Sequence, residues 1–168
     1  MPTKKLLLED RPLYAMQLKQ QGYNCAQAVV VAFADLYGFT PEQAARMSAP
    51  FGGGIGKMRG PCGAALGLFM LMGLASGNTD ATNQAAKQDN YKDVQKMAER
   101  FRQQCGSLLC TRMLGVPPVG PMEEVGYVPT AKDAKKQPCS ETVRIAAQLF
   151  VDYLKERKQE GHAPYPAT

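Results

Sequence analysis

The residues best suited to chemistry in this chain are its five cysteines. Three of them stand in similar places, each within the first turn of a predicted helix: Cys25 follows Asn24, whereas Cys62 and Cys139 each follow a proline. Free backbone N–H groups and the helix dipole make a helix N-terminus electropositive, so we expect the pKa of a thiol placed there to fall. The pattern predicts reactive or metal-binding thiols. The alternative is that these cysteines pack as small buried side chains.

The remaining two cysteines lie five residues apart in a segment that we expect to form one long helix over about Tyr91–Leu114. At about 100° per residue, Cys105 and Cys110 would lie on different faces of that helix. Cys105 falls on the apolar stripe and is assigned to the core, whereas Cys110 lies one turn after Gly106, which leaves room for a close neighbour. We therefore predict a single site that brings together Cys25, Cys62, Cys110 and Cys139.

The stretches around these four cysteines resemble a known family. The resemblance is carried by Cys25, by "GPCGAALG" around Cys62 and the "FGGGIG" before it, by "GSLLCTRMLG" around Cys110, and by Cys139. In order, spacing and glycine context they are similar to the redox-active C_GCAxxG_C_C family, over about residues 23–154. The resemblance implies a redox role for the four cysteines and has no counterpart for Cys105. A related helical module occurs in split-Soret-type cytochromes, which bind haem.

Two kinds of chemistry suit four such thiols. In the first, two of the cysteines cycle between dithiol and disulfide, with one attacking and one resolving, which would make the protein a thiol oxidoreductase. In the second, the same four thiolates hold zinc or an iron–sulfur cluster. A third reading is a helical interaction module in which the cysteines only pack. The resemblance favours redox chemistry, with the redox partner or small-molecule substrate left open. Covalent c-type haem is not expected, because the chain has no C-x-x-C-H motif.

The stretch "FGGGIGKMRG", residues 51–60, contains five glycines and cannot form a regular element. Glycine permits tight backbone geometry, so this loop is expected to bend the chain and deliver Cys62. An alternative is a concavity of backbone N–H groups that binds an anion with help from basic side chains. The residues predicted for the anion site or the pocket wall are Gly52, Gly53, Gly54, Lys57 and Arg59.

The elements that must position these residues are helices, because the sequence has no alternating run of apolar and polar residues long enough to form a β-strand. We predict an all-α, single-domain bundle of about five to six helices over residues 1–160, with the glycine-rich loop before the "CGAALG" helix and a disordered tail at 161–168. The segments 76–90 and 116–138 are expected to be irregular. The predicted helices, besides the long one above, span about Arg11–Gln21, Asn24–Tyr37 with Gln27 completing a capping box, Pro41–Ser48 capped by Thr40, Pro61–Ala75 and Cys139–Lys158.

Composition excludes several other classes of protein. With 45% hydrophobic and 21% charged residues among 168, the chain is typical of a globular domain. Its net charge of +5 is scattered and accompanies no nucleic-acid motif, so no nucleic-acid partner is expected. Its longest apolar stretch has ten residues, too few for membrane insertion, and no signal-peptide core is present, so we expect a cytoplasmic protein. The density of apolar helices makes a homodimer a further expectation to test.

Overall fold

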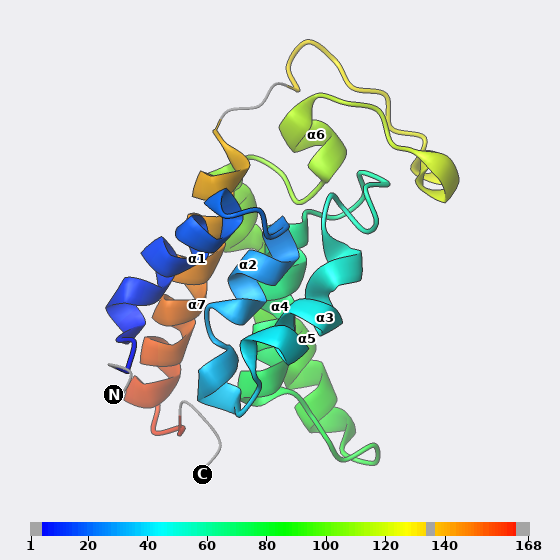
Figure 1. Ribbon diagram of the computed structural model, residues 1–168. Helices are drawn as coiled ribbons and strands as arrows, with labels where there is room; N and C mark the ends of the chain where they lie inside the picture. The colour runs from blue at the N-terminus through cyan, green and yellow to red at the C-terminus, as the bar shows by residue number, and fades with distance from the viewer. Residues whose placement is uncertain (1–4, 134–136, 164–168) are drawn as a thin grey trace.

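The computed structural model describes residues 5–133 and 137–163, and this part of the chain is helical with no β-strand, which confirms the all-α prediction (Figure 1). Most of the tail predicted to be disordered, residues 164–168, lies outside the described residues. The α-helices are α1 Arg11–Gln20, α2 Cys25–Val31, α3 Pro41–Ser48, α4 Gly63–Ser76, α5 Gln84–Cys105, α6 Cys110–Leu114 and α7 Cys139–Gln159. Four 3-10 helices join them: Leu8–Asp10, Ala34–Tyr37, Ala49–Phe51 and Gly120–Val125.

Two helix starts follow directly from the sequence. Asn24 accepts a hydrogen bond from the backbone N–H of Gln27, and the Gln27 side chain bonds back to the Asn24 N–H, which confirms the predicted capping box of α2. Thr40 and Gln43 form the same arrangement at the start of α3, with Pro41 as its first residue. Such caps satisfy backbone donors that a helix leaves unpaired, so they fix where each helix begins.

The prediction of one long helix over Tyr91–Leu114 is wrong at both ends. Helix α5 begins seven residues earlier, because Asn83 caps it by accepting a hydrogen bond from the Ala86 N–H. It ends at Gly106, whose φ of 92° lies in the left-handed region that stops a helix. Cys110 therefore belongs to a separate short helix, α6, and not to the interior of α5. Helix α2 is also shorter than predicted, since a 3-10 helix covers Ala34–Tyr37.

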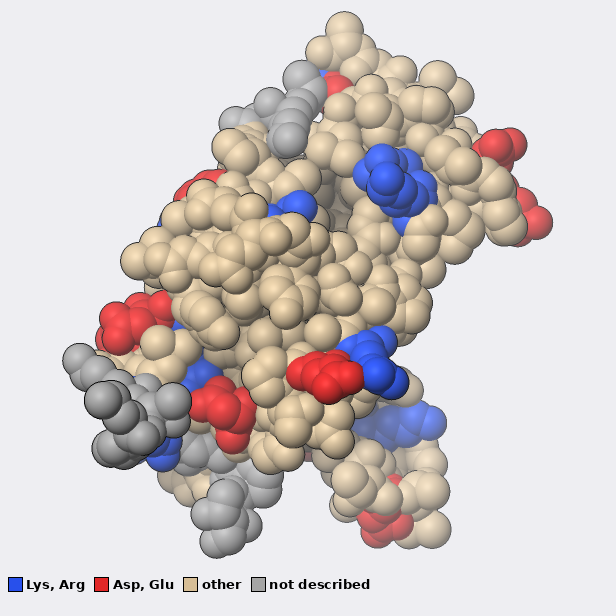
Figure 2. Space-filling view, viewed as in Figure 1, with Lys and Arg blue, Asp and Glu red and all other residues tan. Residues whose placement is uncertain are grey.

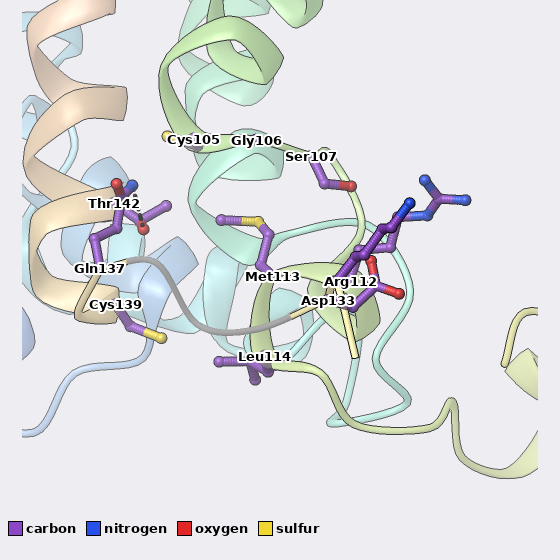
Figure 3. A pocket seen from close by; sticks show the side chains of 11 residues that line it. Cys105, Gly106, Ser107, Arg112, Met113, Leu114, Asp133, Gln137, Cys139 and Thr142 are labelled. Carbon is purple, nitrogen blue, oxygen red and sulfur yellow. Dashed lines mark hydrogen bonds between the residues drawn. The ribbon is translucent and has the colours of Figure 1, made fainter. Parts of the chain in front are cut away.

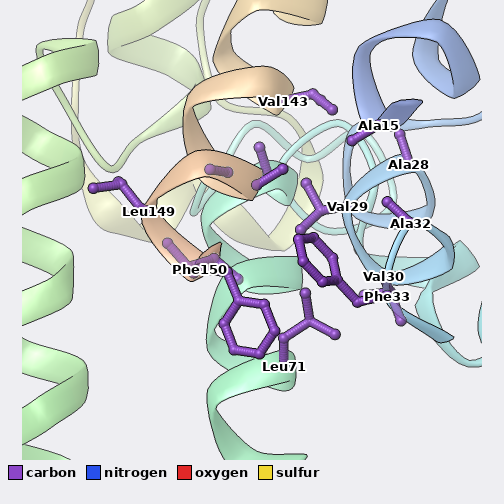
Figure 4. Close-up of a cluster of buried hydrophobic side chains, with 14 of the residues drawn as sticks. Ala15, Ala28, Val29, Val30, Ala32, Phe33, Leu71, Val143, Leu149 and Phe150 are labelled. Atoms are coloured by element: carbon purple, nitrogen blue, oxygen red, sulfur yellow. The ribbon is translucent and has the colours of Figure 1, made fainter. Parts of the chain in front are cut away.

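The core lies where α7 packs against α1, α2, α4 and α5. Figure 4 shows its centre, in which Phe33 and Phe150 meet edge to face with ring centroids 4.9 Å apart. Leu71 of α4 and Val29 of α2 pack around these rings and are fully buried. Burying the apolar side chains of these helices drives the assembly. Among the described residues, every helix is too short or too polar to traverse a lipid bilayer.

Helices α2 and α4 lie close together because two glycines of α4 have no side chain. A Cβ atom at Gly63 would lie 2.8 Å from the Phe51 carbonyl oxygen and 3.3 Å from the Ala26 nitrogen. One at Gly67 would lie 3.1 Å from the Ala26 carbonyl oxygen, so both glycines permit the close approach of the two backbones. In Figure 1, α2, α4 and α7 all begin at the same upper end of the bundle, beside α6.

Candidate four-cysteine site

Four cysteines line one small cavity at this end of the bundle. Each stands where a helix begins: Cys62 is the N-cap of α4, and the other three are the first residues of α2, α6 and α7. The cavity has a volume of about 60 Å³, far below the roughly 300–1,000 Å³ of sites for drug-sized ligands. It is lined by Cys25, Gly53, Gly54, Arg59, Cys62, Gly63, Cys110, Met113, Leu114, Cys139 and Thr142.

Cys25 and Cys139 lie close enough across the interface between α2 and α7 for their thiols to interact. All five cysteines are free thiols in this structure, and these two are half-buried while the other three are buried. The interaction with Cys139 raises the pKa of Cys25 well above its ordinary value, and burial and the neighbouring Cys62 add to the effect. The protonated form of Cys25 is therefore favoured.

Cys62 and Cys110 are held by backbone pairing between the glycine-rich loop and the start of α6. The N–H of Cys62 donates to Leu108 O at 2.7 Å, and the N–H of Cys110 donates to Gly60 O at 2.7 Å. These bonds flank an isolated antiparallel bridge between residues 61 and 109. A Cβ atom at Gly54 would lie 2.7 Å from the Cys110 Cβ, so glycine is required for this approach.

The expectation that helix N-termini would lower the thiol pKa values is wrong for Cys25 and Cys62. Burial raises the pKa of Cys62 to about 12, even though backbone N–H groups of the first turn of α4 act in the opposite direction. Burial likewise raises the pKa of Cys110, despite a hydrogen bond from Arg59 Nη1 to its sulfur at 3.8 Å. The desolvation penalty of a thiolate is larger here than the stabilisation that the helix N-terminus provides.

The glycine-rich loop forms one wall of the cavity through Gly53, Gly54 and Arg59. Gly52 instead packs on Asn24, and Lys57 is exposed and is not among the lining residues. The backbone N–H groups of residues 55–60 all donate to carbonyl oxygens of the protein, so these six do not form the anion-binding concavity considered for the loop.

Three non-glycine residues of this loop adopt left-handed backbone conformations. The φ angles of Ile55, Lys57 and Arg59 are 64°, 61° and 65°. Such conformations cost about 1–3 kcal/mol each for residues with a Cβ, and they persist only where surrounding contacts hold them. The Arg59 carbonyl oxygen accepts from the Thr111 N–H, and the Met58 carbonyl oxygen accepts from the Val119 N–H. Contacts with α6 and the segment after it therefore hold the strained loop against the cysteines.

Two basic side chains lie near the thiols. Lys19, at the end of α1, is close enough to Cys25 to favour its charged form, and Arg59 bonds to Cys110. Figure 2 shows Lys or Arg side chains on either side of a hollow between the bundle and the segment above it. These basic side chains favour the approach of anionic molecules to the hollow.

A second cavity, of about 90 Å³, opens beside the first (Figure 3). The two cavities share Met113, Leu114, Cys139 and Thr142, and we call the second one the outer cavity. Cys105 lines the outer cavity, although it is buried as the sequence predicted. Sequence reasoning missed this cavity because its charged wall combines Arg112 of α6 with Lys132 and Asp133 of the irregular segment after α6. The outer cavity is lined by Cys105, Gly106, Ser107, Arg112, Met113, Leu114, Lys132, Asp133, Gln137, Cys139 and Thr142.

A comparison with protein families gives one result. The family described as "Putative redox-active protein (C_GCAxxG_C_C)" matches residues 23–153, well over half of the chain. The chain belongs to this family. Its description supports redox activity and assigns no role to individual residues. Neither the comparison with curated proteins nor the comparison with solved structures found a match.

Proposed function

We propose that this protein is a thiol–disulfide redox protein in which Cys25 and Cys139 form a reversible disulfide. The observation that carries the proposal is the interaction between these two half-buried thiols, which come from different helices and line one cavity. Membership of a redox-active family supports the same class of activity. A disulfide requires two sulfurs that can approach to about 2.05 Å, and thiols already in contact need only a small movement to reach that distance.

The two thiols take different roles. Cys139 lines both cavities, so a substrate in the outer cavity can reach its sulfur. It is half-buried and is the first residue of the 21-residue helix α7. Cys139 is therefore the attacking thiol, and Cys25 is the resolving thiol.

The reaction is a pair of exchange steps. The Cys139 thiolate attacks one sulfur of a disulfide substrate, which forms a mixed disulfide and expels the other half of the substrate as a thiolate. Cys25 then loses its proton to that leaving thiolate and attacks the Cys139 sulfur, which releases the second half. The second half leaves as a thiolate and takes up from water a proton equivalent to the one that Cys139 released on ionising. The substrate thus gains two electrons and two protons overall, and the protein is left with the Cys25–Cys139 disulfide. An external dithiol reverses both steps.

Cys62 and Cys110 are the inner wall of this site. Their burial keeps them protonated near neutral pH, and protonated thiols are poor nucleophiles. They therefore stay reduced while the half-buried pair reacts. They also keep the cavity apolar and small, which limits water around the reacting sulfurs.

Metal binding is the second candidate, and it is favoured by the gathering of four thiols around one cavity. Four sulfur donors suit zinc or an iron–sulfur cluster. Their positions fit less well, because no group of three or more His, Cys, Asp or Glu side chains in the described part of the chain is arranged to hold a metal ion. We therefore place the disulfide first and let the experiment decide.

The test is disulfide mapping on protein purified without oxygen. Its iron, zinc and sulfide contents are measured first, and a small excess of bis(2-hydroxyethyl) disulfide is then added before N-ethylmaleimide trapping and mass spectrometry. We expect a Cys25–Cys139 disulfide, a trapped mixed disulfide on Cys139 in Cys25→Ser, and no reaction at Cys25 in Cys139→Ser. Stoichiometric metal or sulfide would support the second candidate. Metal-free protein whose thiols all remain reduced would refute both.

A further inference from the structure

The outer cavity has a sulfur-bearing side and a charged side. Figure 3 shows Cys139 and Cys105 on one side, Arg112 and Asp133 on the other, and Met113 between them. The cavity thus joins the attacking thiol of the proposed redox pair to groups that can bind charge. Its volume of about 90 Å³ admits only a small ligand or one end of a larger one.

The charged side offers both signs of charge. The Arg112 guanidinium lies over the Tyr127 ring, 4.5 Å from its centroid, and makes no ion pair with a described residue. Lys132 adds a second cation to the lining. Asp133 accepts hydrogen bonds from Tyr127 and Thr130 through Oδ2 alone, so within the described part of the chain its Oδ1 remains open to a ligand.

We propose that the outer cavity binds the substrate of the redox pair, and that this substrate is a small thiol or disulfide carrying an α-amino carboxylate. The carboxylate would pair with Arg112, with help from Lys132, and the ammonium would pair with Asp133 Oδ1. Bidentate pairing of guanidinium with carboxylate gives both strength and orientation. The sulfur end would then lie at Cys139, which the cavity places opposite these charges.

This inference rests on the proposed function and gives its overall reaction a specific form. One amino-acid disulfide and the Cys25, Cys139 dithiol become two amino-acid thiols and the Cys25–Cys139 disulfide. Two electrons and two protons pass from protein to substrate, and no other reactant is needed. The reverse reaction oxidises two amino-acid thiols.

Four probe disulfides separate the contributions of charge. L-Cystine carries both groups, 3,3′-dithiodipropionate carries only carboxylates, cystamine carries only ammonium groups, and bis(2-hydroxyethyl) disulfide is neutral. The rate at which each oxidises the reduced, full-length protein to the Cys25–Cys139 disulfide is measured by quenched mass spectrometry. Each rate is divided by the rate at which the same probe oxidises dithiothreitol. We expect the normalised rate for L-cystine to exceed the other three by about tenfold or more, in the range that one good charge-assisted contact supplies.

Single substitutions assign the two charges. Arg112→Gln is expected to slow L-cystine and dithiodipropionate about tenfold, and Asp133→Asn is expected to slow L-cystine and cystamine, while the neutral probe is unaffected by either. Lys132→Gln removes the second cation and is expected to slow the same two probes less than Arg112→Gln does. Arg46→Gln is the matched control, because this exposed arginine pairs with Glu42 on α3 and should leave all four rates unchanged.

Each outcome bears on one claim. Equal normalised rates for all four probes, or an L-cystine rate that Arg112→Gln leaves unchanged, would overturn the substrate inference while the redox function stands. A dithiodipropionate rate equal to that of L-cystine would overturn the role of Asp133 and with it the amino-acid assignment. If no probe produces the Cys25–Cys139 disulfide, the proposed function itself fails.

Discussion

Replacing Gly63 by alanine tests whether the close approach of α2 and α4 sets the geometry of the cysteine site. The new Cβ would lie 2.8 Å from the Phe51 carbonyl oxygen and 3.4 Å from the Cys25 Cβ. The first distance is too short for a carbon and a backbone oxygen, so the loop or α2 must move, and such overpacking costs about 1–3 kcal/mol. The higher helix propensity of alanine stabilises the protein by less than about 1 kcal/mol at this position, because Gly63 is the first residue of α4.

Gly73 is the matched control on the same helix. It is exposed, and a Cβ there would meet nothing within 4 Å, so Gly73→Ala should stabilise the protein by about 0.5–1 kcal/mol. Urea unfolding of the reduced proteins gives both values, and quenched mass spectrometry gives the rate of Cys25–Cys139 formation. We expect Gly63→Ala to be about 1–3 kcal/mol less stable than Gly73→Ala and slower to form the disulfide. Equal stabilities would show that the contact is not tight and would refute the argument.

Two further predictions concern titration. Because burial raises the pKa of Cys62 to about 12, iodoacetamide should alkylate Cys62 in the native protein much more slowly than Cys139 at pH 7. The alkylation rate of Cys62, measured by peptide mapping, should rise about tenfold per pH unit up to pH 9.5. A plateau in that rate below pH 9 would contradict this prediction. Arg11 is fully buried and donates hydrogen bonds to Ala32 O, Leu6 O and Asp35. Arg11→Met should therefore lower the free energy of unfolding by about 1–3 kcal/mol at pH 7, chiefly because it leaves the two carbonyl oxygens unpaired. Arg11 lowers the pKa of Asp35, so the wild-type protein should lose folding stability as the pH falls below about 3.8. Acid unfolding curves should show that Arg11→Met loses less folding stability over the same pH range.

The sequence was sufficient for the fold class and for the helix starts that depend on local caps. Asn24 and Thr40 fix their helices through bonds to residues three positions away, which a sequence displays directly. The end of α5 was missed because Gly106 was interpreted as a helical residue that leaves space, whereas its positive φ ends the helix. The start of α5 was missed because the polar residues around Asn83 resemble a linker.

The candidate site, like the fold, could be predicted from the sequence only in part. The motif identified which four cysteines to consider, but the contact between Cys25 and Cys139 joins residues far apart in the chain and could not be read from spacing. The raised pKa values were also out of reach, because burial depends on how the helices pack and not on local sequence. The outer cavity depends on an irregular segment whose path no periodic pattern predicts.

The raised pKa values explain how one pair among four neighbouring thiols can be selected for reaction. If all four thiols ionised near neutral pH, their mutual repulsion in a small apolar cavity would be severe, and several pairings would compete. Burial instead favours the protonated forms of Cys62 and Cys110, and the pKa of Cys25 is raised as well. Cys139 is also the cysteine shared by both cavities. Under the proposed function, the raised pKa values of the other thiols and the access to Cys139 both favour reaction at Cys139, and the strained loop beside Cys110 would hold the unreactive wall in place.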